Sequence, residues 1–306
     1  MATLGRLLTA MVTPFDASGE LDCQQAKKLA KALIDSGSDG LVLSGTTGES
    51  PTLSHNEKLR LFAEVRSAVG QPLIANTGSY STRESMELTR ETERLGVDAI
   101  LLVVPYYNKP TQEGLFQHFK SIADCTSLPC ILYNVPSRTV TSLDAETVIR
   151  LSQVSNIVGM KEASGNLEQV AKIVQSVKRD FLVYSGNDSD TFPIMTLGGY
   201  GVISVVSHLA GVQIRQMIDK LLEGKTGEAA EIHRRLLPLV NAMFVLSNPM
   251  PLKYALNRIG FSVGKPRLPL TEPDEKSRAV IEAALREYHI DLPVPGVEMK
   301  VGEALP

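Results

Sequence analysis

The chain has 306 residues, 43% of them hydrophobic, and a net charge of −3, which is the profile of an ordinary globular protein. Lys and Arg form no cluster, so we expect no nucleic-acid partner. The longest apolar run, 99–105, is too short to cross a bilayer, so we expect no membrane span. The five histidines are scattered, which argues against a metal site. The three cysteines form no C-x-x-C motif, which favours a reducing, cytoplasmic compartment.

Eight short apolar runs alternate with helical patterns over the first 220 residues or so. Strands that read as nearly continuous apolar runs are typical of a parallel sheet covered on both faces. The expected strands are 7–13, 40–44, 72–76, 99–104, 130–134, 157–161, 181–185 and 201–206.

The segments between these runs carry the apolar stripe of surface helices, as in 26–34 and 214–222. S-x-x-E capping boxes at Ser54 and Ser81 mark two helix starts. Eight strand–helix units of this size predict an α/β fold of the (β/α)8 TIM-barrel type. A doubly wound open sheet is the alternative, but no strand is followed by G-x-G-x-x-G.

The strand pattern ends near residue 224. A new apolar stripe covers 232–243, and 277–288 has a helical pattern. We therefore predict two domains: a catalytic barrel over 1–224 and a helical C-terminal appendage over 225–306.

Functional groups of such barrels sit where the strands end and the loops begin. Lys161 ends the sixth expected strand, and strict alternation would place Ile157, Gly159 and Lys161 on one face. If that face points inward, burial disfavours the charged amine, and the free amine can attack a carbonyl carbon. A lone lysine at a strand tip more often extends to solvent. Its neighbours therefore decide the interpretation.

Three neighbouring features suit a keto acid. Tyr133 ends the fifth strand, where a phenol could shuttle protons, although a core tyrosine bonded to a carbonyl is the simpler alternative. Arg138 could grip a carboxylate with both nitrogens, or form an ordinary surface ion pair. The loop 45–50, GTTGES, offers hydroxyls and turn N–H groups for a carboxylate, but lacks the GK[ST] of a P-loop and could be a plain flexible loop.

The loop after the seventh strand bears on the substrate. Its sequence over 185–190, SGNDSD, has two Asp and no basic residue. Barrels that use phosphorylated substrates usually bind phosphate after strands 7 and 8. An unphosphorylated keto acid is therefore the better fit.

As a set, five motifs resemble the dihydrodipicolinate synthases, a family of pyruvate-dependent Schiff-base aldolases, over residues 1 to about 290. They are GTTGES (45–50), PYYNKPTQEGL (105–115), LYNVPSRT (132–139), VGMKEASGN (158–166) and SGNDS (185–189). The resemblance implies a lyase that condenses pyruvate with L-aspartate semialdehyde to 4-hydroxy-tetrahydrodipicolinate, in lysine and diaminopimelate biosynthesis. It also implies a homotetramer that needs no cofactor beyond the covalent pyruvate.

Carried over residue by residue, the resemblance implies the following catalytic roles. Lys161 forms the Schiff base with pyruvate, and Tyr133 is the central proton shuttle. Thr46 and Tyr107 complete a hydroxyl relay, with Tyr107 reaching across a dimer interface.

The resemblance also implies a set of binding residues. Thr47 and its loop amides hold the carboxylate of pyruvate. Arg138 binds the carboxylate of aspartate semialdehyde, while Gly186 and the backbone of Ile203 line the pocket.

Two other functions stay open at this point. Sialic-acid lyases and sugar-acid aldolases resemble the chain at Lys161 and Tyr133, but they usually lack the S-R-T continuation that carries Arg138. A catalytically silent barrel that serves as a binding or scaffold protein belongs to another class. The joint presence of the relay residues, Lys161 and Arg138 argues against it, because a silent relative would be free to lose any of them.

Some members of the family are inhibited by lysine between subunits. The positions that match that pattern are Ser50, His55, Glu84 and Tyr106. Lys58 stands where a His is typical of lysine-sensitive bacterial members, and Tyr80 where an Asn is typical. A cation at 58 would repel the lysine ammonium, so we expect weak or absent feedback.

Overall fold

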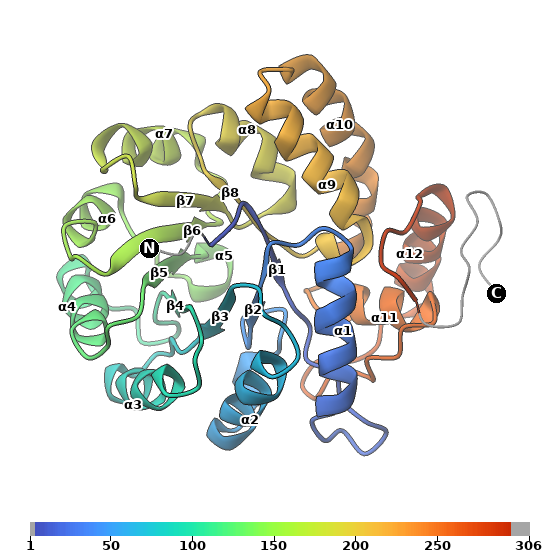
Figure 1. Cartoon of the computed structure of the whole chain (residues 1–306), viewed down its shortest axis with the longest axis horizontal. Helices are drawn as coiled ribbons and strands as arrows, with labels where there is room; N and C mark the ends of the chain where they lie inside the picture. The colour runs from blue at the N-terminus through green and yellow to red at the C-terminus, as the bar shows by residue number, and fades with distance from the viewer. Residues whose placement is uncertain (1–3, 295–306) are drawn as a thin grey trace.

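The computed structural model describes residues 4–294, and its centre is a closed barrel of eight parallel strands in chain order (Figure 1). Strand β8 pairs with β1 and closes the barrel, so the sheet has no free edge. The strands are β1 (Leu7–Ala10), β2 (Gly40–Leu43), β3 (Leu73–Asn76), β4 (Ala99–Val103), β5 (Cys130–Asn134), β6 (Ile157–Glu162), β7 (Leu182–Ser185) and β8 (Gly201–Ser204).

Helices surround the barrel and continue past it at the C-terminal end of the chain. The helices between and after the strands are α1 (Cys23–Asp35), α2 (His55–Arg66), α3 (Thr82–Glu93), α4 (Gln112–Ala123), α5 (Pro136–Thr139), α6 (Ala145–Leu151), α7 (Leu167–Ser176), α8 (Thr191–Thr196) and α9 (Ser207–Leu222). The C-terminal helices are α10 (Thr226–Met243), α11 (Met250–Arg258) and α12 (Glu275–Glu287). Two short 3-10 turns, η1 (Ser50–Thr52) and η2 (Asp188–Asp190), follow β2 and β7.

The predicted (β/α)8 fold is confirmed. Two strands, β1 and β8, end earlier than predicted. β1 ends three residues early, because the chain then turns and the hydroxyl of Thr13 donates to the carbonyl of Gly48 at 2.7 Å. β8 ends at Ser204, because the next two N–H groups, of Val205 and Val206, donate to the carboxylate of Asp188.

The helix starts follow the predicted caps. Ser54 precedes α2 and exchanges hydrogen bonds with Glu57, which completes the capping box. Ser81 precedes α3 and accepts from the N–H of Glu84, which is one half of such a box. Each satisfied N–H removes a donor that would otherwise lack a partner at the helix start.

The barrel interior is filled by apolar side chains. The interior cluster is formed by Leu4, Leu8, Ala10, Val42, Ile74, Ala99, Leu101, Ile131, Tyr133, Val135, Ala163, Tyr184 and Ile203. Two further clusters lie between the strands and the outer helices. The barrel is therefore a packed core rather than a channel, and ligands must bind at one of its ends.

The predicted alternation along β6 is wrong at Ile157. The pairing of β5 with β6 shifts by one residue between Cys130 and Ile131, which is a β-bulge. As a result Ile157 packs in the outer cluster, while Val158 packs against the interior. An extra residue in one strand reverses the face on which the side chains before it lie. The period-two pattern of β6 therefore does not hold across the bulge.

Of the C-terminal helices, α10 packs against α9, and α12 packs against α10 and α11 (Figure 1); all three share one core with the barrel. Leu236 of α10, Leu252 of α11 and Leu285 of α12 belong to the same cluster as Leu7 of β1. The chain turns between α9 and α10 at residues 223–225, and the division into domains at 224 stays a prediction.

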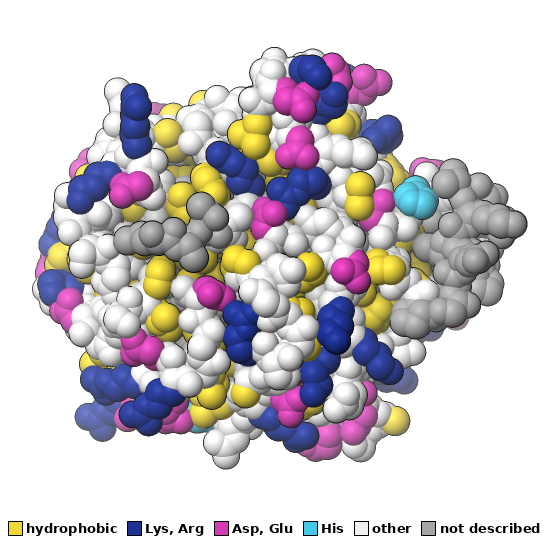
Figure 2. All heavy atoms as spheres, in the orientation of Figure 1, with side chains coloured by type: hydrophobic (Ala, Val, Ile, Leu, Met, Phe, Trp, Pro, Cys, Tyr) yellow, Lys and Arg dark blue, Asp and Glu magenta, His cyan; other side chains and the backbone are white. Residues whose placement is uncertain are grey.

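The surface carries both signs of charge. On the face seen in Figure 2, Lys and Arg side chains are interspersed with Asp and Glu side chains. Ion pairs join neighbouring helices, such as Lys27 with Glu64 and Lys172 with Glu146, both at 2.5 Å. Within residues 4–294, no helix has the length and apolar character needed to span a membrane.

Candidate active site

Lys161 and Tyr133 lie side by side at the C-terminal end of the barrel. The two residues are paired in the register of β5 and β6. The lysine is 4% exposed, and its Nζ lies 4.4 Å from the centroid of the Tyr133 ring. The side chain of Lys161 therefore does not extend to solvent, and the amine and the phenol ring meet in a buried setting.

A buried polar network fixes these two strand ends. Asn134 follows Tyr133, and its Nδ2 donates to the carboxylate of Glu162, which follows Lys161, at 3.1 Å. The Oδ1 of Asn134 accepts from the N–H of Leu143 at 2.9 Å. Glu162 accepts in addition from the N–H of Ser164 at 2.6 Å. Because every partner is buried or held by backbone, the network orients the strand tips that carry the amine and the phenol.

Two glycines let neighbouring strands approach β6 closely. A Cβ on Gly159 would lie 2.4 Å from the carbonyl oxygen of Leu182, so this glycine makes room for β7 rather than for the amine. A Cβ on Gly186 would lie 2.7 Å from the Cβ of Ala163. The N–H of Gly186 donates to the carbonyl of Glu162 at 2.7 Å, which joins the strand-7 loop to the tip of β6.

A cavity of about 290 Å³ opens next to Tyr133. It is near the lower end of the usual range of small-molecule sites, about 300–1,000 Å³, and suits small acids. Its walls come from the loop after β2, from the ends of β3, β4 and β5 with the segments that follow them, and from the C-terminal part of the chain. The polar lining residues are Thr46, Glu49, Ser50, Thr52, Asn76, Tyr106, Tyr133, Arg138, Thr139 and Asn248.

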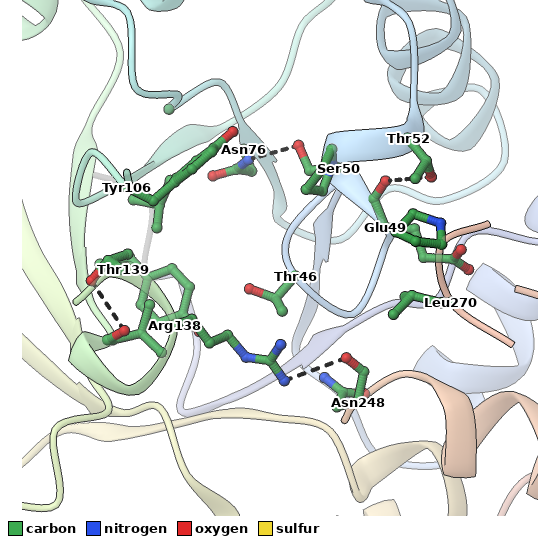
Figure 3. A pocket seen from close by; sticks show the side chains of 16 residues that line it. Thr46, Glu49, Ser50, Thr52, Asn76, Tyr106, Arg138, Thr139, Asn248 and Leu270 are labelled. Carbon is green, nitrogen blue, oxygen red and sulfur yellow. Dashed lines mark hydrogen bonds between the residues drawn. The ribbon is translucent and has the colours of Figure 1, made fainter. Parts of the chain in front are cut away.

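Arg138 and Thr47 are connected through one residue of the C-terminal part, Asn248. The guanidinium of Arg138 reaches from α5 across the cavity and donates to the carbonyl of Asn248 at 3.4 Å (Figure 3). The Nδ2 of Asn248 donates to the hydroxyl of Thr47 at 2.8 Å. The two predicted carboxylate-binding groups are thus held by the same residue.

The structure brings some of the predicted site residues to the cavity and places others behind it. Thr46, Tyr133 and Arg138 line the cavity. Thr47, Lys161 and Ile203 are buried at the neighbouring strand ends, and Gly186 is half-buried there; none of the four is part of the cavity lining.

Tyr107 stands apart from the other predicted site residues. It is 93% exposed and its backbone has a φ of 76°. A non-glycine residue in the left-handed region is uncommon and needs surrounding contacts to hold it there. Its neighbour Tyr106 does line the cavity and packs edge-to-face on Tyr80, with ring centroids 5.3 Å apart.

One of the two acidic residues of the strand-7 loop is used internally. Asp188 is buried, and its carboxylate accepts from the hydroxyl of Ser204 and from two N–H groups after β8. Burial raises the pKa of Asp188 above its usual value, against the hydrogen bond of Ser204, which lowers it. The nearby ammonium of Lys161 also lowers this pKa. Asp188 therefore ties the ends of β7 and β8 together beside the candidate nucleophile.

The sequence prediction missed the residues that form the far wall of the cavity. Glu49, Asn76, Asn248 and Leu270 line it together with the predicted residues (Figure 3). Glu49 lies in the GTTGES loop that the sequence analysis singled out, although no role was predicted for it, and Asn76 could have been found by extending the strand-end rule to β3. Asn248 and Leu270 had no such signal, because the C-terminal part reaches the cavity only after the chain has folded back over the barrel.

A second cleft, of about 250 Å³, lies beside α2 and α3. It holds His55, Lys58 and Glu84. Burial lowers the pKa of the Lys58 ammonium, and the negative charge of Glu84 partly reverses this. Among the described residues, no group of His, Cys, Asp or Glu is arranged to hold a metal ion.

Known proteins resemble the chain over almost its whole length. A model of the Dihydrodipicolinate synthetase family matches residues 3–288. A 4-hydroxy-tetrahydrodipicolinate synthase of Dehalococcoides mccartyi (strain CBDB1) is 62% identical over 96% of this chain and 100% of that protein. A crystal structure of dihydrodipicolinate synthase DapA-2 from Bacillus anthracis is 43% identical, with a TM-score of 0.92 over 94% of this chain and 99% of the other.

A second solved structure was determined with lysine bound. It is the dihydrodipicolinate synthase of Cyanidioschyzon merolae, 46% identical, with a TM-score of 0.91 over 92% of this chain and 97% of the other. The matched region contains the whole barrel, the cavity and the C-terminal helices. The chain therefore belongs to the Dihydrodipicolinate synthetase family.

Proposed function

We propose that the chain condenses pyruvate with L-aspartate semialdehyde, giving 4-hydroxy-tetrahydrodipicolinate for lysine and diaminopimelate biosynthesis. The observation that carries this proposal is the buried amine of Lys161 against Tyr133, beside a cavity that also contains Arg138. Lys161 supplies the nucleophile, Tyr133 the proton carrier and Arg138 the group that binds a carboxylate. The family membership agrees with this chemistry and does not favour the sugar-acid alternative.

The first half of the reaction activates pyruvate. The free pair of Lys161 Nζ attacks the keto carbon, and the keto oxygen leaves as water, so no external cofactor is needed. In this proposal Tyr133 carries protons to and from this oxygen, and its ring contact with Lys161 supports the role. Thr46 lines the same cavity and can pass the proton onward. Loss of a methyl proton from the resulting iminium gives an enamine.

The second half joins the substrates. The enamine carbon attacks the aldehyde carbon, and the aldehyde oxygen takes a proton. The amine of the second substrate then attacks the iminium carbon, closes the ring and releases Lys161. In this proposal Thr47 with its loop amides binds the carboxylate of pyruvate, and Arg138, which lines the cavity, binds that of the semialdehyde. Gly186 and the backbone of Ile203 would complete the pocket at the ends of β7 and β8.

The choice of second substrate is tested by competition. Aspartate semialdehyde, glyceraldehyde and N-acetylmannosamine should be offered to the enzyme at equal concentration with saturating pyruvate. We expect kcat/KM for aspartate semialdehyde to exceed that of the polyhydroxylated partners by about 10³ or more, because only it has a carboxylate for Arg138. Comparable values for a sugar would favour the aldolase alternative.

The position of Tyr107 predicts that activity depends on assembly. We propose that the working form is a homotetramer built from dimers, in which Tyr107 enters the partner's site. Its exposed ring and left-handed backbone support this, because the ring is accessible to a partner subunit. Specific activity should fall when the enzyme is diluted below the dissociation constant of the dimer, measured by sedimentation under the same conditions. A dissociated monomer with full turnover would contradict the relay.

Lys58 and Tyr80 predict weak feedback by lysine. The cleft already holds the ammonium of Lys58 near Glu84, so a ligand ammonium would meet a like charge. We expect a midpoint of inhibition above about 1 mM, the upper end of the usual metabolite range. Substituting Lys58→His together with Tyr80→Asn should lower the midpoint. A midpoint below about 1 mM in the unaltered enzyme would refute the prediction.

We also propose the cytoplasm as the compartment of the enzyme. Its three cysteines, Cys23, Cys125 and Cys130, are all free thiols. Free thiols persist where the surroundings are reducing, and Cys23 and Cys130 are buried as small apolar fillers.

A further inference from the structure

The loop that carries Thr46 and Thr47 is held by charges from the C-terminal part of the chain. Glu49 borders the cavity, next to the C-terminal segment that carries Leu270 (Figure 3). Its Oε1 lies 2.6 Å from the ammonium of Lys253, and its Oε2 accepts from the backbone N–H of Arg267 at 2.8 Å. The carboxylate of Glu49 therefore binds both α11 and the segment that follows α11.

Among the described residues, Glu49 is the acidic partner of the buried ammonium of Lys253. Both side chains are 0% exposed. The ammonium also donates to the carbonyl of Lys265 at 3.3 Å and lies 4.0 Å above the ring of Phe15. Burial lowers the pKa of Lys253 to about 8, while Glu49 raises it. A buried ion pair is rarely more stabilising than apolar groups of the same volume. The contribution of this pair is therefore to fix the conformation of the loop rather than to raise the stability of the fold.

The geometry of this loop needs external support. Glu49 has a φ of 56° and Ser44 a φ of 53°, so both residues at the ends of the turn are in the left-handed region. Such conformations cost free energy and persist where surrounding contacts hold them. Asn248 holds Thr47, and Thr13 holds the carbonyl of Gly48. The carboxylate of Glu49 adds charged contacts to these hydrogen bonds, with the ammonium of Lys253 and with the N–H of Arg267.

We propose that Glu49 and Lys253 are positioning residues for the carboxylate-binding loop. Neither touches the reacting atoms. Their ion pair holds the turn so that Thr46, Thr47 and the loop N–H groups face the cavity before pyruvate arrives, which lowers the ordering cost of binding. This inference rests on the proposed function, because it concerns the affinity for pyruvate.

The test separates positioning from folding by removing one charge and then both. Glu49→Gln and Lys253→Met each leave one buried charge without a partner, so both should lower the melting temperature. The double variant buries no charge and has a similar volume, so its melting temperature should recover. Its KM for pyruvate should still be about tenfold above wild type, since the loop has lost its ion pair to α11 and keeps only its hydrogen bonds. KM for aspartate semialdehyde and kcat should change less than threefold.

The controls make each outcome decisive. Lys27→Met with Glu64→Gln removes an ion pair between α1 and α2, far from the cavity, and should leave all three constants unchanged. A double variant at Glu49 and Lys253 with wild-type KM for pyruvate would overturn the inference. If that variant does not fold, Glu49→Asp keeps the charge but shortens the reach, and an unchanged KM there would overturn it equally. Absence of a pyruvate adduct in the wild-type enzyme would instead refute the proposed function.

Discussion

Lys161→Ala is expected to lower kcat by roughly 10⁴-fold or more, because the covalent intermediate can no longer form. The side chain is buried at the tip of β6, so its loss leaves a small cavity, while the nearby buried Asp188 keeps its hydrogen bonds from Ser204, Val205 and Val206. The melting temperature should therefore stay close to that of wild type. Steady-state assays at saturating concentrations of both substrates, with thermal melting alongside, measure both effects.

The matched control is a lysine on the outer surface. Lys172 lies on α7 and is paired with Glu146 at 2.5 Å, with its side chain more than half exposed. Lys172→Ala should leave kcat within threefold of wild type, because an exposed ion pair contributes little. If Lys161→Ala retained wild-type turnover, another residue would have to be the nucleophile.

Tyr133→Phe is expected to lower kcat by roughly 10²–10³, the usual share of one acid–base group. The change removes only the hydroxyl, so the ring stays against the Nζ of Lys161. Binding of pyruvate should persist while formation of the Schiff base slows. Single-turnover trapping of the adduct separates these two steps. A loss of less than about threefold would remove Tyr133 from the mechanism.

A second tyrosine of the same cluster provides the control. Tyr184 is buried in the barrel interior with Tyr133, but its hydroxyl donates to the carbonyl of Gly5 at 2.8 Å. Tyr184→Phe should leave turnover within threefold. It should cost about 1 kcal/mol of folding free energy, the typical net value of one hydrogen bond. The two variants therefore separate proton transfer from packing.

The barrel could be predicted because its strands are buried on both faces and so form continuous apolar runs in the sequence. The ends of those runs also indicated where the candidate catalytic residues lie. Lys161, Tyr133 and Arg138 were predicted because polar groups at strand ends meet at one end of a barrel. Burial of Lys161 and its contact with Tyr133 agree with the prediction, whereas their catalytic roles stay proposals.

Some features could not be predicted from the sequence, chiefly because they depend on contacts between distant segments. The bulge in β6 arises from its pairing with β5, and no local pattern near Ile157 indicates it. Helices α5, α6 and α8 have four, seven and six residues, too few for an apolar stripe to emerge. Asn248 reaches the cavity through tertiary folding of a segment that was predicted only as an appendage.

The most direct measurement is borohydride reduction of the enzyme in the presence of pyruvate, followed by peptide mass mapping. Reduction converts a Schiff base into a stable secondary amine, so the modified residue can be identified. We predict a single pyruvyl adduct, on the peptide that contains Lys161, that disappears in Lys161→Ala. An adduct on another lysine, or none while the enzyme turns over, would contradict the account.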